Sequence, residues 1–194
     1  MARLSDIKLI AQVVTFGSER AFAQLVEAHQ ETVRRFLCRL TAGDGMRADD
    51  LAQETFIRAW QGLSSFRQLS GFETWLLRIA YRVFLDDERK EKNRPKGEGL
   101  ESLRDGEAAQ MSYNRRQAAL TSPLSPDSSL RHDLDLALAT LSETERTCVV
   151  LQFVEGQSVR DIATITGLLE NTVKSHLLRG KRHLADYLRK NGYN

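Results

Sequence analysis

The chain has few cysteines and no cluster of metal-binding residues. Cys38 and Cys148 are the two cysteines, and they lie far apart within helical patterns. Two such thiols cannot supply a disulfide framework, and buried core positions explain them better than a redox or metal site. The four histidines form no group with metal-ligand spacing around either cysteine. We therefore expect no metal site.

Long hydrophobic runs are also missing. No segment approaches the ~20 apolar residues that a membrane-spanning helix needs. Residues 1–20 contain no long apolar core and no small-residue cleavage site. We expect a cytoplasmic protein with no membrane insertion. The sequence also lacks a glycine-rich phosphate loop and a nucleophile elbow, so we expect neither an enzyme nor a bound cofactor.

Proline is rare and confined to one stretch. All three prolines lie between residues 93 and 130, together with several glycines and serines. Proline fixes φ and removes a backbone donor, so this composition predicts a linker at 93–130, with room for a short helix at 107–120. Elsewhere no strand-like alternation is sustained. The expected fold class is therefore all-α, with two small helical domains at 1–92 and 131–194 joined by a flexible linker.

Apolar residues at three- and four-residue steps predict a helix bundle in the first domain. A weak pattern covers residues 4–14. A stronger one follows Ser18, a predicted N-cap, and ends at the turn at 43–45. A third helix is expected at 49–63, where two opening aspartates suit the positive end of a helix dipole. A fourth is expected to begin at 72 and to run through Phe84.

The second domain contains the most specific local pattern. Residues 158–173, SVRDIATITGLLENTV, fit a helix-turn-helix. Ala163 is small where two helices must cross closely, and Gly167 lies where the tight turn requires positive φ. Val173 is expected to anchor the second helix in the core. Ser158 can cap the first helix, predicted at 159–165.

The net charge is only +2, which by itself favours neither nucleic acid nor a membrane as partner. The basic residues are concentrated on the second helix of the motif, predicted at 169–188, whose apolar residues keep to one face. A nearly one-signed face on such a helix is better explained by phosphate contacts than by solvation alone.

The helix-turn-helix geometry predicts which residues touch DNA. A recognition helix enters the major groove with its N-terminal residues facing base edges. Lys and Arg can bind guanine, Asn can bind adenine, and Leu can contact a thymine methyl, whereas phosphate ligands set only the register. The predicted DNA-contacting residues are Asn171, Thr172, Lys174, Ser175, Leu178, Arg179 and Arg182.

Several segments resemble one bacterial family in the family's order. They are 21–26 (AFAQLV), 48–60 (ADDLAQETFIRAW), 72–80 (FETWLLRIA), 141–146 (LSETER), 155–158 (EGQS) and 172–177 (TVKSHL). The chain resembles the RNA polymerase sigma factors of the extracytoplasmic-function subclass over nearly its whole length outside the linker. The resemblance implies a subunit that guides core RNA polymerase to promoter DNA and helps to open it, with an anti-sigma factor as a further partner.

The resemblance also implies roles for individual residues. The recognition helix at 171–182 would read the −35 element. A loop and the helix after it would read and melt the −10 element, with site residues Phe66, Phe72, Arg78, Tyr81, Arg82 and Arg89. The helix at 49–63 would dock on the polymerase through Asp50, Gln53, Glu54, Arg58 and Trp60.

Two observations leave questions at this stage. The family often has Arg-Asn where this chain has Tyr81-Arg82. Because that asparagine would read a base, the resemblance does not imply which −10 bases this chain contacts. The string at 171–177, NTVKSHL, also resembles the output domain of response regulators, which bind DNA without joining a polymerase. That alternative requires an α/β receiver domain, whereas residues 1–92 show only helical periodicity. If the chain is a sigma factor with a flexible linker, we expect its two lobes to move independently in the free protein.

Overall fold

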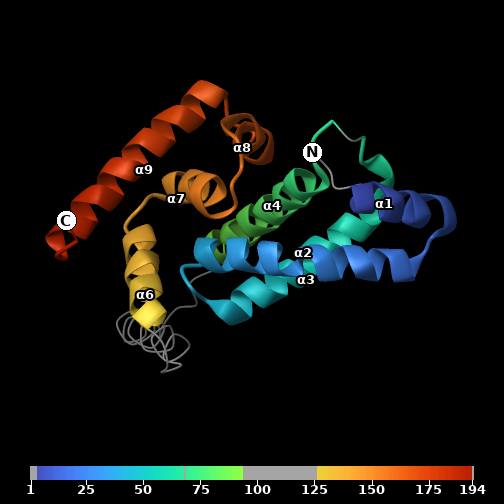
Figure 1. Ribbon diagram of the computed structural model, residues 1–194, viewed down its shortest axis with the longest axis horizontal. Coiled ribbons are helices and arrows are strands. Elements are labelled where there is room, and N and C mark those ends of the chain that lie inside the picture. The colour runs from blue at the N-terminus through green and yellow to red at the C-terminus, as the bar shows by residue number, and fades with distance from the viewer. Residues whose placement is uncertain (1–3, 68, 94–125, 194) are drawn as a thin grey trace.

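The computed structural model describes residues 4–67, 69–93 and 126–193, with side chains from 133 onward in the last segment. All regular elements in these ranges are helices, which confirms the all-α prediction of two helical domains (Figure 1). The predicted linker residues 94–125, including the helix expected at 107–120, lie outside the described residues.

The N-terminal lobe is a bundle whose helices begin at side-chain caps. The Ser18 hydroxyl accepts a hydrogen bond from the Ala21 amide at 3.2 Å, as predicted for an N-cap. The third helix begins earlier than expected, because the Asp44 carboxylate accepts from the Arg47 amide at 3.1 Å. The helices are α1 (Leu4–Phe16), α2 (Glu19–Leu40), α3 (Gly45–Gly62) and α4 (Phe72–Asn93), with a 3₁₀ turn, η1 (Leu63–Ser65).

The C-terminal lobe begins before the predicted boundary at residue 131. Its first helix starts at Pro126, because proline is well suited to the first turn of a helix, where its missing N–H has no partner to lose. The elements are α6 (Pro126–Ala139), α7 (Glu143–Val149), the π-helical turn η2 (Val150–Val154), α8 (Val159–Thr166) and α9 (Glu170–Lys190).

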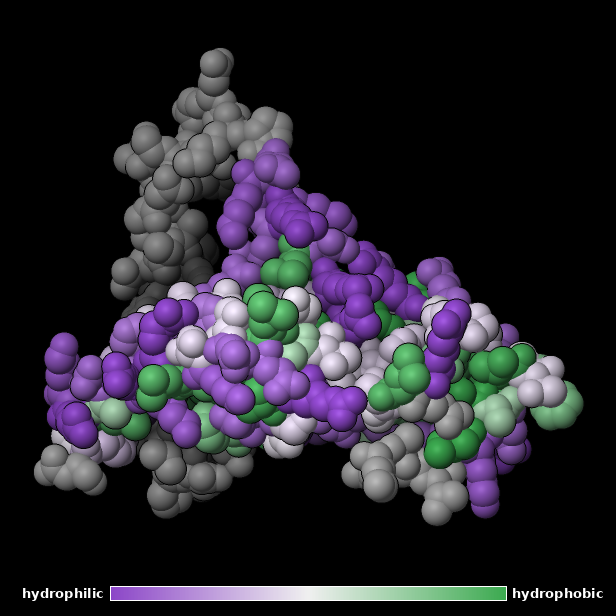
Figure 2. Space-filling model, turned by 90° about the horizontal axis from the view of Figure 1, so that it is seen from above, coloured by the Kyte–Doolittle hydropathy of each residue, from purple (hydrophilic) through white to green (hydrophobic). Residues whose placement is uncertain are grey.

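The two lobes pack against each other, which corrects the expectation of independent lobes. Helix α8 packs on α4, and α7 and η2 pack on α2 (Figure 1). Buried apolar residues of both lobes belong to one continuous core, from Ile10 in α1 to Leu177 in α9. The surface of this assembly is mostly hydrophilic in the view of Figure 2, and apolar residues gather towards the N-terminal lobe at the right.

Candidate nucleic-acid interface and docking surfaces

Helices α8 and α9 form the predicted helix-turn-helix. The Ser158 hydroxyl accepts from the Asp161 amide at 3.1 Å and so caps α8. Gly167 ends α8 with φ +76°, a left-handed conformation that glycine adopts without the strain of a Cβ atom. Val173 is fully buried. The cap, the turn and the anchor of the motif are therefore confirmed.

The first turns of α9 are free to meet a partner. Asn171, Lys174 and Ser175 are exposed, and Leu178 is 53% exposed although it is apolar. Ser175 donates its hydroxyl hydrogen to the Asn171 carbonyl oxygen at 2.9 Å, which leaves its lone pairs available. Together these residues present donors, acceptors and one apolar contact on one stretch of helix.

Helix α9 lies unusually close to α7. A Cβ atom added at Gly180 would stand 2.7 Å from the Val149 Cγ2 atom, a distance that real Cβ atoms do not show. Glycine at this position therefore lets the two helix backbones approach. Nothing in the local sequence distinguishes Gly180 from a helix-weakening residue, so its role is visible only in the packing.

Glu145 joins α7 to α9 through charge. Its side chain is 8% exposed and lies 3.3 Å from both the Arg179 Nε and the His183 Nδ1 atoms. Burial would raise the pKa of Glu145, but hydrogen bonds from Ser142 and the nearby His183 lower it further than burial raises it. Ser142 and Glu145 also form a capping box at the start of α7, which the S-x-x-E pattern could have revealed.

A basic cavity of about 400 Å³ lies between α4 and the end of α8. Arg78, Arg82 and Arg89 line it from α4, and Ile165 to Gly167 line it from α8. Among the described residues, neither Arg78 nor Arg82 lies within 4 Å of a carboxylate oxygen, whereas Arg89 lies 3.9 Å from Asp86. The cavity therefore concentrates positive charge on the face of α4 that looks towards the C-terminal lobe.

An apolar groove of about 650 Å³ runs along α2 and α3 on another face of the N-terminal lobe. Trp60 is 39% and Ile57 46% exposed there, and the Trp60 ring meets Phe22 edge-on with centroids 4.9 Å apart. The lining residues are Glu19, Phe22, Ala23, Val26, Gln53, Phe56, Ile57 and Trp60. Exposed apolar side chains in a groove are typical of a protein-binding surface.

Comparison with known families matches both lobes. The family model of sigma-70 region 2 matches residues 25–94, and that of sigma-70 region 4 matches residues 131–184. The ECF RNA polymerase sigma factor SigW of Bacillus subtilis is 30% identical over 185 residues, which are 94% of this chain and 97% of SigW. The chain belongs to the ECF RNA polymerase sigma factors.

Other relatives agree with this family. The ECF sigma factor SigE of Mycolicibacterium smegmatis is 37% identical over 169 residues, 86% of this chain and 61% of SigE. The chain spans only 40% of another relative, RfaY of Xanthomonas campestris. The solved structure of the sigma factor RpoE in complex with the anti-sigma factor NepR from Bartonella quintana matches with a TM-score of 0.64 at 25% identity. That match covers 87% of this chain and 96% of RpoE.

Within region 4 of this sigma factor, one predicted DNA ligand is already engaged. Arg179 contacts Glu145 and also lies 3.0 Å from the His176 Nδ1 atom, so its guanidinium is held towards α7. The contact of Arg179 with DNA stays a prediction. Thr172 is half-buried beside Val173, and Arg182 is exposed further along the helix.

Within region 2, two predicted −10 residues are buried. Phe72 is 1% exposed and packs on the His29 ring with centroids 5.1 Å apart. It is a core residue, which corrects the expectation that it holds a base. Tyr81 is 7% exposed beneath the C-terminal lobe. The Phe66 ring lies edge-on to Phe72, with ring centroids 5.7 Å apart. Phe66 is half-buried and is therefore more accessible than Phe72 or Tyr81.

The predicted docking residues divide between two faces of α3. Gln53 and Trp60 line the apolar groove, and Asp50 is exposed near the start of the helix. Arg58 instead faces α4: it donates to Asp86 of that helix and to Glu54, one turn earlier on α3 itself, at 2.7 Å each. The groove is also lined by Phe22, Val26, Phe56 and Ile57. Only the packing shows this, because apolar residues at helical spacing are equally typical of a core.

Two features are absent from the residues that the structure describes. Within 4–67, 69–93 and 126–193, no helix combines the length and hydropathy that crossing a bilayer requires. In the same ranges, no three His, Cys, Asp or Glu side chains cluster as metal ligands would. The regular elements at 4–67 and 69–93 are all helices, so these residues do not form the strands of a response-regulator receiver.

Proposed function

We propose that this chain is a sigma subunit that binds core RNA polymerase and directs it to specific promoters. The observation that carries the proposal is the exposed start of α9 on a helix-turn-helix that follows a separate region 2 lobe. A regulator that binds DNA alone has no need of the second lobe and its apolar groove. The proposed function therefore accounts for both halves of the chain.

The −35 element would be read by the first turns of α9. Asn171 suits adenine, Lys174 suits guanine, and Leu178 can meet a thymine methyl group. Arg182 is placed to bind phosphate, which sets the register of the helix in the groove. The close seat of α9 on α7 would fix the angle at which this helix enters.

The −10 element would be opened on region 2. A base that leaves the stack costs a few kcal/mol and must be held on a flat side chain while its phosphates are neutralised. Arg78, Arg82 and Arg89 supply the positive charge. Phe66 and, once uncovered, Tyr81 supply the flat surfaces. No base identity follows from these residues.

The groove along α2 and α3 would bind the polymerase. It offers exposed apolar side chains at its centre, with Gln53 and Glu19 as polar neighbours. Burial of such a groove supplies affinity, and the polar neighbours restrict how the partner sits. We further propose that the protein works in the cytoplasm and that an anti-sigma factor controls it, as NepR binds RpoE in the similar complex.

Core polymerase and run-off transcription test this proposal. The wild-type chain should be retained by immobilised core polymerase and should start transcripts at a defined subset of genomic fragments. Lys174→Ala should keep polymerase binding but weaken promoter binding by roughly 1–3 kcal/mol. Lys190→Ala, the same charge change in the last turn of α9, is the control. Failure of the wild-type chain to bind core polymerase would reject the proposal.

A further inference from the structure

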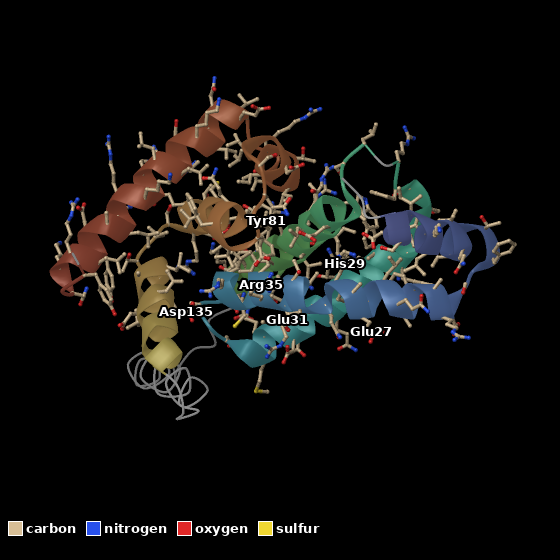
Figure 3. All side chains as sticks on the ribbon, viewed as in Figure 1. Glu27, His29, Glu31, Arg35, Tyr81 and Asp135 are labelled. Carbon is tan, nitrogen blue, oxygen red and sulfur yellow. The ribbon has the colours of Figure 1, made fainter. Side chains whose placement is uncertain are left out.

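The turn between η2 and α8 binds the N-terminal lobe through a buried carboxylate. Glu155 accepts from Arg35 at two points, Nε to Oε1 at 3.0 Å and Nη2 to Oε2 at 2.6 Å. The Glu155 side chain is only 1% exposed, and that of Arg35 is 38% exposed. A charge buried this deeply requires a partner, and its partner comes from the other lobe. Figure 3 shows Arg35 on α2 where that helix meets the C-terminal lobe.

The next side chain of the turn reaches the start of α4. Gln157 accepts from the Thr74 hydroxyl at 3.2 Å and donates its amide to Glu73 Oε1 at 3.1 Å. Its amide therefore has both a donor and an acceptor on region 2. The turn is thus hydrogen-bonded to α2 through Glu155 and to α4 through Gln157.

Two arginines form hydrogen bonds between the lobes on the other side of their apolar contact. Arg39 on α2 donates to Asp135 on α6 at 2.5 Å. Arg146 on α7 donates to the Leu40 carbonyl oxygen at 3.2 Å, and so satisfies an acceptor at the end of α2. Polar contacts therefore lie on both sides of the apolar contact between the lobes.

This closed arrangement covers the surface that opens DNA. Tyr81 lies beneath α7, close to Thr147 and Cys148 (Figure 3). The C-terminal end of α8, which is the negative end of its helix dipole, faces Arg78 and Arg82 across the basic cavity. The end of a helix thus takes the place that phosphate oxygens would take. The first turns of α9 stay exposed.

We propose that the Glu155–Gln157 turn is a latch that holds this sigma factor closed and hides its −10 surface while leaving its −35 surface available. The proposal rests on the proposed function for its consequence in transcription, although the latch itself is a property of the free chain. Core polymerase would separate the lobes when it binds. Unlatching should therefore raise binding of single-stranded DNA and leave duplex binding by α9 unchanged.

The latch is tested by the distance between the lobes of the full chain. Spin labels at Met46→Cys in α3 and Asp186→Cys in α9, both exposed positions, report that distance once Cys38 is replaced by serine. Arg35→Glu places a second carboxylate against Glu155 and should move most molecules to longer distances. Arg34→Glu is the matched control, because its partner Asp49 lies in the same lobe. The double variant Arg35→Glu/Glu155→Arg should restore the short distance.

Binding of fluorescent DNA of random sequence supplies the second measurement. Arg35→Glu should bind a single strand on the order of tenfold more tightly than Arg34→Glu, because a larger fraction of molecules is competent. Their affinities for duplex should agree. Unchanged distance and unchanged single-strand affinity in Arg35→Glu would overturn the latch. If the lobes separate but no variant binds a single strand, the latch stands, and the assignment of the −10 surface to α4 fails.

Discussion

At the scale of single residues, Glu145 connects two helices of region 4. It closes a capping box on α7 and lies against Arg179 and His183 of α9. We expect Glu145→Ala to lower the free energy of unfolding by about 1–2 kcal/mol, because a capping partner and a buried acceptor are both lost. Urea unfolding at pH 7 measures this, with Glu143→Ala as the control one residue from the cap.

The pH dependence of that loss has a definite sign. The pKa of Glu145 in the folded protein lies below its ordinary value of 4.5. A lowered pKa stabilises the fold above the ordinary value, and this contribution disappears as the pH falls through the folded-state value. The difference between wild type and Glu145→Ala should therefore narrow below about pH 4.5. A difference that stays constant there would show that the charge of Glu145 contributes nothing.

At the scale of elements, the close packing of α9 on α7 fixes the position of the recognition helix. Gly180→Ala gains about 1 kcal/mol of helix propensity, but its new methyl group stands 2.7 Å from Val149 Cγ2. Overpacking of this kind costs about 1–3 kcal/mol, so we expect a net loss of stability. Thermal unfolding measures it, and Val149→Ala in the same chain should recover part of the loss.

A second glycine provides the comparison. Gly62, at the end of α3, has room for a Cβ atom, because the nearest neighbour is a Trp75 carbon at 3.7 Å. Gly62→Ala should therefore leave stability unchanged or raise it slightly. If Gly180→Ala were as stable as Gly62→Ala, the helices would have room to separate, and the seat of α9 would be less defined than the contact implies.

The groove on α2 and α3 is the element that we assign to polymerase docking. Ile57→Ser removes an apolar side chain that is already 46% exposed, so the lobe should stay folded. We expect the affinity for core polymerase to fall about tenfold, as loss of a partly buried isoleucine at an interface implies. Met46→Ser, on the same helix but outside the groove, is the control. Equal affinities for the two variants would place the docking surface elsewhere.

At the scale of the whole molecule, Tyr81 reports whether the lobes are closed. Burial raises the pKa of Tyr81 to about 12, with smaller contributions from Glu143 and Cys148. A raised pKa contributes stability that is present below pH 10 and is lost as the pH rises from about 10 to about 12. The closed arrangement should therefore weaken in that range.

Absorbance of tyrosinate measures this ionisation. The difference between wild type and Tyr81→Phe isolates one phenol, which we expect to ionise near pH 12 in the closed protein. In an Arg35→Glu background the same phenol should ionise nearer pH 10, because water reaches it. Ionisation of Tyr81 near pH 10 in the wild type would mean that the lobes do not stay closed in solution.

Local signals were enough to predict much of this protein. Ser18 and Ser158 were found as caps, and Gly167 as the left-handed end of α8, because caps and turns depend on residues within one or two turns of the chain. Helical periodicity predicted the bundle, since each helix repeats its own buried face. The start of α3 was misplaced by a few residues because Asp44 and the paired aspartates after it are both acceptable N-terminal signals.

Contacts between segments far apart in the chain were decided only by the tertiary structure. Nothing near Tyr81 in the sequence shows that α7 will cover it, and nothing near Glu155 identifies Arg35, 120 residues earlier, as its partner. Arg179 has the type and position of a base reader, and only the packing shows that Glu145 of α7 lies beside it. The helices, the motif and the family could therefore be predicted from the sequence, because these depend on neighbours along the chain. Which side chains remain free to act depended on how the lobes close, because burial and ion pairing are properties of packing.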